Sequence, residues 1–307
     1  MPLNADSQAL VDRMRSSPPI HELGVEAARQ ISAHTKSAPG PEVGSVEDRN
    51  IPSVDGEVAV RVYTPVGEGP FPALVVIHGG GFVMGSVNTL DGHARRHCDR
   101  LGCVVVSVDY RLAPEAKFPL PLEDCYAAVK WVAEQAEELG VDATRIAITG
   151  ESTGGNLAAA TALLARDRSG PNLVGQVLVV PLLDRNYETA SWKDYSQYPP
   201  FPETMEWFWE QYLHPDDDAT SPYVVPLRSD DLTGLPPTLV ITAEADPLRD
   251  DGERYAERLA EAGVDVQSTR YDGVAHMFYL MAGILQRGDE AFDLAQATLE
   301  AMFGQPR

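Results

Sequence analysis

The feature that constrains this chain most is a serine between two glycines, in residues 150–154, which read Gly-Glu-Ser-Thr-Gly. The apolar run 145–149 before it has the pattern of a buried strand, and a helical pattern begins near residue 155. A sharp turn from strand to helix strains the backbone at Ser152, and glycines two residues before and after it leave room for that conformation. In this context the motif predicts a nucleophilic serine, and an ordinary glycine-rich turn is the alternative.

The rest of the chain repeats the same strand-to-helix order. Short apolar runs typical of strands buried on both faces are 73–77, 104–108, 145–149, 176–180, 238–243 and 266–271. Amphipathic helical patterns occupy 122–139, 156–168, 252–263 and 290–302. This alternation predicts an α/β fold with a doubly wound, mostly parallel central sheet flanked by helices. At residues 58–62, valine alternates with other residues, which predicts an antiparallel strand at the edge of the sheet.

Two segments fall outside this pattern. Helical patterns at 7–14 and 24–34 precede the first strand, and residues 184–223 are rich in aromatic residues and prolines. We expect residues 1–45 and the insertion 184–223 to form a helical cap, and we expect 46–183 and 224–307 to form the catalytic core. The insertion is either a packed surface subdomain or also a lid over a hydrophobic substrate pocket, and these two interpretations are compatible.

Charge and composition narrow the class of protein. The 307 residues include 46 acidic and 24 basic ones, and the net charge of −22 would repel a phosphate backbone, so nucleic-acid binding is not expected. The N-terminus has no signal-peptide pattern and no run of about 18 apolar residues occurs, so we expect a cytoplasmic protein without a membrane span. Cys98, Cys103 and Cys125 form no metal-binding pattern and are expected to be reduced and mostly buried.

A second motif with chemical meaning follows the predicted strand 73–77. Residues 78–82 read His-Gly-Gly-Gly-Phe, and consecutive glycines leave main-chain N–H groups free to approach a substrate oxygen. Together with the N–H of Thr153, Gly79, Gly80 and Gly81 are therefore candidates for an oxyanion hole. A phosphate-binding loop is the alternative, but no Gly-Lys-Ser/Thr follows and no G-x-G-x-x-G is present.

The base that would activate Ser152 is found by elimination. When a serine lies on this kind of turn, the acid and then the histidine follow it along the chain. Of the seven histidines, five precede Ser152, and His214 lies in the aromatic insertion, before the strand expected to carry the acid. His276 remains, in a loop after the predicted strand 266–271.

The acid is expected in the loop after the preceding predicted strand. Asp246, which is followed by a proline, is the preferred candidate. Glu244 is nearer the strand end, and Asp250 and Asp251 fit better as charges in the first turn of the next helix. Asp246 would fix the tautomer of His276 and stabilise the imidazolium that forms when the serine loses its proton.

These motifs resemble the hormone-sensitive lipase family of esterases, the bacterial branch with an H-G-G-G motif and a G-D-S-A-G elbow. The resemblance covers nearly the whole chain and rests on five motifs in the same order. They are residues 78–82, residues 109–115, the elbow with Gly155 and Asn156, residues 246–250 and His276. The resemblance implies an α/β-hydrolase fold, carboxylesterase activity on short- to medium-chain acyl esters, no cofactor, and a cap made from the N-terminal helices and the insertion.

The resemblance also assigns roles within the motifs. It implies that Gly80 and Gly81, more than Gly79, donate hydrogen bonds to the oxyanion. It further implies that His78 and residues 110–115 hold the glycine loop in shape and take no part in the chemistry.

Two residues depart from the family pattern, Glu151 in place of Asp and Thr153 in place of Ala. Only the main-chain N–H of Thr153 is needed, so we still expect activity, with a β-branched side chain that narrows the pocket. Aromatic and apolar residues near the motifs are candidates for the acyl and alcohol pockets. They are Phe82, Trp207, Phe208, Met277 and Phe278.

Other functions are weighed against this one. His93 and His97 have the spacing of two metal ligands on one helix face, but no third ligand is evident, and a partly exposed basic face with Arg95 and Arg96 is preferred. A peptidase or amidase on the same fold would use the same triad. A receptor built on a disabled hydrolase is disfavoured because all three triad residues are present. A small-molecule ester is the expected partner, and a homodimer is compatible with the sequence.

Overall fold

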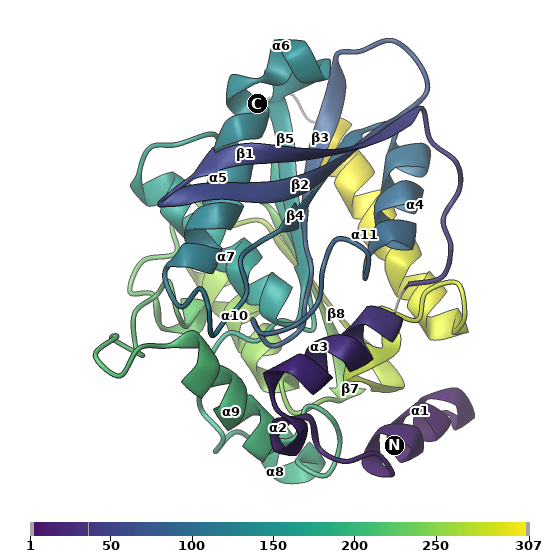
Figure 1. Ribbon diagram of the computed structural model, residues 1–307, viewed down its shortest axis with the longest axis vertical. Helices are drawn as coiled ribbons and strands as arrows, with labels where there is room; N and C mark the ends of the chain where they lie inside the picture. Colours follow the sequence, from purple (N-terminus) through teal and green to yellow (C-terminus); the bar gives the residue numbers. More distant parts are fainter. Residues whose placement is uncertain (1–2, 36, 305–307) are drawn as a thin grey trace.

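The computed structural model describes residues 3–35 and 37–304, and its centre is one eight-stranded sheet (Figure 1). The strands are β1 (Ser45–Ser53), β2 (Gly56–Thr64), β3 (Phe71–Ile77), β4 (Val104–Asp109), β5 (Val141–Glu151), β6 (Gly175–Val179), β7 (Thr238–Ala245) and β8 (Val266–Ala275). Their order is β1-β2-β4-β3-β5-β6-β7-β8, with β2 antiparallel to both its neighbours and every other pair parallel. The predicted mostly parallel sheet with an antiparallel edge is confirmed.

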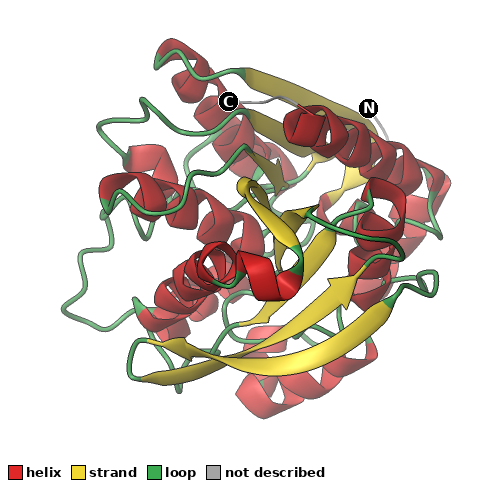
Figure 2. Ribbon diagram, turned by 90° about the horizontal axis from the view of Figure 1, so that it is seen from above, coloured by secondary structure: helices red, strands yellow, loops and turns green. Residues whose placement is uncertain are grey.

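Helices cover both faces of this sheet (Figures 1 and 2). One face carries α5 (Leu120–Glu134), α7 (Thr153–Asp167) and α10 (Arg249–Glu261), and the other carries α4 (Asp91–Leu101) and α11 (Gln286–Gly304). In the central strands β3, β4 and β5, alternate residues join two separate apolar clusters, one on each face of the sheet. The doubly wound architecture follows from this arrangement, since strands buried on both sides need helices on both sides.

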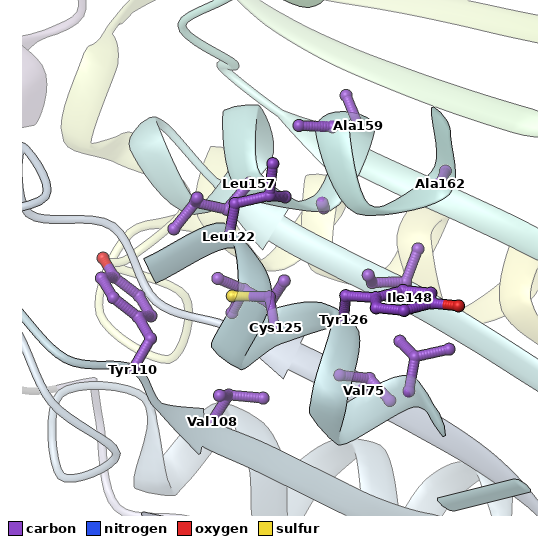
Figure 3. Packing of buried hydrophobic residues seen from close by; sticks show 14 of the residues in the cluster. Val75, Val108, Tyr110, Leu122, Cys125, Tyr126, Ile148, Leu157, Ala159 and Ala162 are labelled. Carbon is purple, nitrogen blue, oxygen red and sulfur yellow. The ribbon is translucent and has the colours of Figure 1, made fainter. Parts of the chain in front are cut away.

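Helix α7 is buried along almost its whole length. Every residue from Thr153 to Ala165 is buried, and a helix that is apolar on all sides belongs in the interior. Figure 3 shows Leu157 of α7 beside Leu122 of α5, and both belong to the same apolar cluster. The alanines let α7 approach the sheet closely, so its first turn, which follows Ser152 directly, is held between two packed layers.

Two elements differ from the predicted pattern. Strand β1 was not predicted, because as an edge strand it pairs only with β2, exposes charged residues and contains Pro52, so it shows no clear alternation. The helix predicted at 122–139 is two helices, α5 and α6 (Ala136–Leu139), which are separated by Gln135.

Five helices from the segments outside the repeating pattern lie beyond the carboxyl ends of the parallel strands (Figure 1). They are α1 (Ala5–Arg15), α2 (Ile20–Leu23), α3 (Val25–His34), α8 (Ala190–Tyr195) and α9 (Pro202–Tyr212). His21 Nδ1 lies 3.0 Å from the Thr204 hydroxyl and joins α2 to α9. Two short 3-10 helices, η1 (Pro226–Arg228) and η2 (His276–Phe278), complete the fold. Within the described ranges, no helix is both long and apolar enough to cross a membrane.

Asp124 of α5 ties three parts of the chain together near the sheet edge. Its carboxylate is fully buried and accepts hydrogen bonds from the Ser53 hydroxyl and from the main-chain N–H of Arg111. The Arg111 guanidinium donates two more, with Nη2 2.7 Å from Oδ1. Removal of Asp124 would leave Arg111 and the Ser53 hydroxyl without their acceptor, and loss of one partner of a buried ion pair strongly lowers the free energy of unfolding.

We therefore expect Asp124→Ala to lower the free energy of unfolding by about 3 kcal/mol, measured by urea denaturation followed by circular dichroism. Glu134→Ala in the same helix is the matched control, because Glu134 is exposed and forms an ion pair with Lys130 at the surface. That control should change the free energy by no more than about 0.5 kcal/mol. Equal effects of the two substitutions would contradict this account.

Candidate active site

Ser152 lies at the turn between β5 and α7 with a φ of 57° and a ψ of −119°. A side chain on Gly150 would come within 2.1 Å of the Gly154 carbonyl oxygen, and one on Gly154 within 2.3 Å of the Ile77 carbonyl oxygen. Both glycines are therefore required by close main-chain contacts, as their spacing predicts. The positive φ of the serine costs about 1–3 kcal/mol, which the buried strand and helix on either side offset.

Asp246 and His276 follow two adjacent parallel strands and meet at Ser152. Asp246 comes directly after β7 and His276 directly after β8, and the carboxyl ends of parallel strands share one edge of the sheet. His276 Nε2 is 2.9 Å from Ser152 Oγ, and His276 Nδ1 is 2.7 Å from Asp246 Oδ2. Asp246 Oδ1 accepts a hydrogen bond from the Leu248 N–H, which fixes the carboxylate. The three side chains can pass a proton from the hydroxyl to the imidazole.

Burial and neighbouring charges shift the pKa of His276 in opposite directions. Burial by itself lowers the pKa of the imidazole. The Asp246 charge, its hydrogen bond and the Glu151 charge all raise this pKa, and together they outweigh burial, so the pKa of His276 is above 6.5. Burial also raises the pKa of the Glu151 carboxyl to about 7. The imidazole is therefore protonated, and unable to accept the serine proton, in mildly acidic solution.

The three carboxylates that competed with Asp246 have other partners. Glu244 accepts a hydrogen bond from a main-chain N–H in β8 at 2.7 Å, and Asp250 accepts one from α8 at 2.8 Å. Asp251 accepts two from the chain after β6. Among the four, the structure brings only Asp246 to His276. His214 lies just after α9, where its main-chain N–H donates to the Asp217 carboxylate.

The glycine loop lies beside the serine. A side chain on Gly79 would come within 3.4 Å of Ser152 Cβ. The main-chain N–H groups of Gly79, Gly80 and Thr153 donate to no other residue in the described part of the chain. The N–H of Gly81, in contrast, donates to the Thr153 hydroxyl at 3.0 Å. Three of the four expected oxyanion donors thus have no protein acceptor within the described residues, and the fourth is already hydrogen-bonded to a side chain.

Several contacts hold this loop in place. The Tyr110 hydroxyl donates to the His78 carbonyl oxygen at 3.0 Å, and the two rings are stacked with centroids 4.3 Å apart. The Ala113 N–H donates to the Phe82 carbonyl oxygen at 2.9 Å. These contacts are of the kind that the resemblance implies for His78 and residues 110–115.

Arg29 of α3 fastens the N-terminal helices to the same loop, and it is not among the residues predicted from the sequence. Its guanidinium donates to the carbonyl oxygens of Val83 and Ala113, both at 2.9 Å, and forms an ion pair with Glu115. The partners lie 54, 84 and 86 residues away along the chain, so no local pattern could reveal them.

The five pocket candidates occupy different environments. Phe82 is 0% exposed and stacks on Tyr212, and Phe278 is 1% exposed and packs in the core cluster beside α11. Phe208 of α9 lies against the glycine loop, since a side chain on Gly81 would come within 2.4 Å of its ring. Trp207 and Met277 are partly buried. A role in substrate binding stays a prediction for all five.

His93 and His97 are core residues, so the exposed basic face expected for them is wrong. Both are buried, and their rings contact Phe292 with centroids 4.9 and 4.6 Å away. Burial lowers the pKa of each to about 3, and the two arginines between them are partly exposed. They line a cavity of about 20 Å³ together with Glu151 and Tyr279. Across residues 3–35 and 37–304, no group of three His, Cys, Asp or Glu side chains is arranged to hold a metal ion.

Comparisons with known proteins agree with this geometry. A family profile described as alpha/beta hydrolase fold matches residues 74–280. An arylesterase of Saccharolobus solfataricus is 40% identical over 79% of this chain and 80% of its own length, and the carboxylesterase NlhH of Mycobacterium tuberculosis is 39% identical over 90% and 89%. The structure of a hyperthermophilic esterase from the archaeon Pyrobaculum calidifontis is 41% identical, with a TM-score of 0.90 over 98% of this chain and 99% of that one.

The raised pKa of His276 predicts the effect of Asp246→Asn on the pH profile. Neutral imidazole can accept the serine proton and imidazolium cannot, so we expect kcat/KM to rise with pH through a midpoint above 6.5 in the native protein. Asp246→Asn removes the charge that raises this pKa and leaves the burial that lowers it. We expect the midpoint to move to lower pH and kcat to fall about 10⁴-fold, measured with an activated ester.

Asp250→Asn is the matched control for this experiment, because Asp250 lies nearby along the chain, in the first turn of α10, and bonds to α8. It should leave the acidic midpoint where it is. A midpoint that stays unchanged, or moves to higher pH, in Asp246→Asn would contradict the assignment.

Proposed function

Because this chain belongs to the α/β-hydrolase fold family, on the hormone-sensitive lipase branch whose members are carboxylesterases, we propose that Ser152, His276 and Asp246 are the catalytic triad of a serine carboxylesterase. The observation that carries the assignment is the pair of hydrogen bonds on either side of the His276 ring, 2.9 Å to Ser152 and 2.7 Å to Asp246. This arrangement supports nucleophilic catalysis, since the base touches the nucleophile and is oriented by a third group.

In the first half of the reaction, Ser152 Oγ attacks the carbonyl carbon of the ester while its proton moves to His276 Nε2. The carbonyl oxygen becomes an oxyanion, and the free N–H groups of Gly80 and Thr153 are the donors that would stabilise it. When the intermediate collapses, the ester C–O bond breaks and His276 gives the proton to the departing alcohol. The acyl group stays on Ser152.

In the second half, water takes the place of the alcohol. His276 accepts a proton from the water, whose oxygen attacks the acyl carbon, and the second tetrahedral intermediate uses the same donors. Collapse of this intermediate returns the proton to Ser152 Oγ and releases the carboxylic acid. Ester and water are the only reactants that these steps consume.

We propose that residues 1–45 and 184–223 act as a cap over this site. The His21–Thr204 hydrogen bond, which joins α2 to α9, and the position of Phe208 against Gly81 support this division. The cap would supply walls of a pocket for short- to medium-chain acyl groups, with Trp207 of α9 partly buried, and Met277 of η2, also partly buried, would contribute from the core.

We further propose a cytoplasmic enzyme that acts on small esters and does not bind nucleic acid. Cys98, Cys103 and Cys125 are free and buried, which supports a reducing compartment. The net charge of −22 disfavours a polyanionic partner. A homodimer stays a prediction.

The substrate series p-nitrophenyl acetate, butyrate, octanoate and palmitate tests the function, with the matched p-nitroanilides beside the esters. We expect turnover of acetate to octanoate and a fall of at least about 10⁴-fold in kcat for Ser152→Ala. Faster cleavage of the anilides would favour an amidase. Saturable binding without turnover would favour a receptor.

A further inference from the structure

The side chain of Thr153 joins the two halves of the oxyanion hole. Catalysis needs only the main-chain N–H of this residue, and the resemblance implies alanine at this position. The Thr153 hydroxyl nevertheless accepts a hydrogen bond from the Gly81 N–H at 3.0 Å, and the residue is 1% exposed. One hydroxyl therefore links the nucleophile elbow directly to the glycine loop, across 72 residues of sequence.

A second hydroxyl holds the other end of the same loop. Tyr110 donates to the carbonyl oxygen of His78 at 3.0 Å, so the segment from His78 to Gly81 is held at its first carbonyl and its last N–H. Burial, the largest effect, raises the pKa of the Tyr110 phenol well above 10.0, and the Thr153 hydroxyl lowers it in part.

The loop needs such anchors because its own backbone has little preference for one conformation. Gly80 has a φ of 126° and Gly81 a φ of 65°, values that glycine adopts among many others. An oxyanion donor works only when it lies at hydrogen-bond distance from the oxygen in the transition state, and a displacement of about 1 Å costs about 10²-fold in rate.

We propose that Thr153 is a positioning residue, whose side chain holds the Gly81 N–H and so sets the distance between the free N–H groups of Gly80 and Thr153, two of the oxyanion donors. This inference rests on the proposed function. It also changes the expected set of donors, because the Gly81 N–H is committed to the hydroxyl and the oxyanion is stabilised by the other two.

Thr153→Val tests the inference, because valine keeps the shape of threonine and lacks the hydroxyl. The buried Gly81 N–H then has no acceptor, and the loop shifts to find one. We expect kcat for p-nitrophenyl butyrate to fall about tenfold, the size of one lost hydrogen bond, with little change in KM. Thr153→Ser restores the hydroxyl and should restore most of kcat.

Thr161→Val is the matched control. Thr161 lies in the same helix, is fully buried, and its hydroxyl has no hydrogen-bond partner within the described chain. The same substitution there should leave kcat unchanged. A trifluoromethyl ketone forms a tetrahedral adduct with the serine and so probes the oxyanion hole. It should bind more weakly to Thr153→Val than to the native protein, and with unchanged affinity to Thr161→Val. A merely structural role would give both variants the same affinity.

Wild-type kcat or a higher kcat in Thr153→Val would overturn the inference, since a hydroxyl that competes for the Gly81 donor would give a gain. If the valine variant does not fold, Thr153→Ala removes the same hydroxyl and carries the same expectations. Ser152→Ala is measured beside these variants. Full activity in that variant would refute the proposed function itself, independently of Thr153.

Discussion

The strained turn at Ser152 is the constraint on which the rest of the site depends. A serine with a φ of 57° is stable only where the elements on either side cannot relax, and here β5 enters from the middle of the sheet and α7 leaves through the core. The alanines of α7 permit that close packing, and the glycines at 150 and 154 remove the side chains that would collide with the turn. The position of the nucleophile is therefore set by packing over the whole fold.

The other reactive groups come to the serine because parallel strands end at one edge of a sheet. Asp246 and His276 each follow a strand by one residue, and the glycine loop follows β3, which is a direct neighbour of β5. The charge of Asp246 also sets the pKa of His276. The Asp246 carboxylate outweighs the effect of burial, which by itself would lower the pKa of His276, so this pKa is raised.

Most of the fold, and the three side chains that meet at Ser152, could be predicted from the sequence, because both depend on local patterns and on their order along the chain. Buried strands form apolar runs, and the elbow has glycines at fixed spacing. Strand β1 escaped prediction because an exposed edge needs no apolar alternation, and His93 and His97 were misplaced because their spacing does not tell which face of α4 is buried. Arg29 and the Thr153 hydroxyl act on residues 54 to 86 positions away, and such contacts exist only in the folded chain.

The central claim is that Ser152 forms the covalent bond to the substrate, and stoichiometric labelling with a fluorophosphonate tests it most directly. The reagent adds a phosphonyl group to an activated serine with loss of fluoride, and peptide mass spectrometry locates the adduct. The account predicts one adduct per chain, located on Ser152, with loss of ester hydrolysis in proportion to labelling. An adduct at another residue, or full hydrolysis after Ser152 has been labelled, would contradict it.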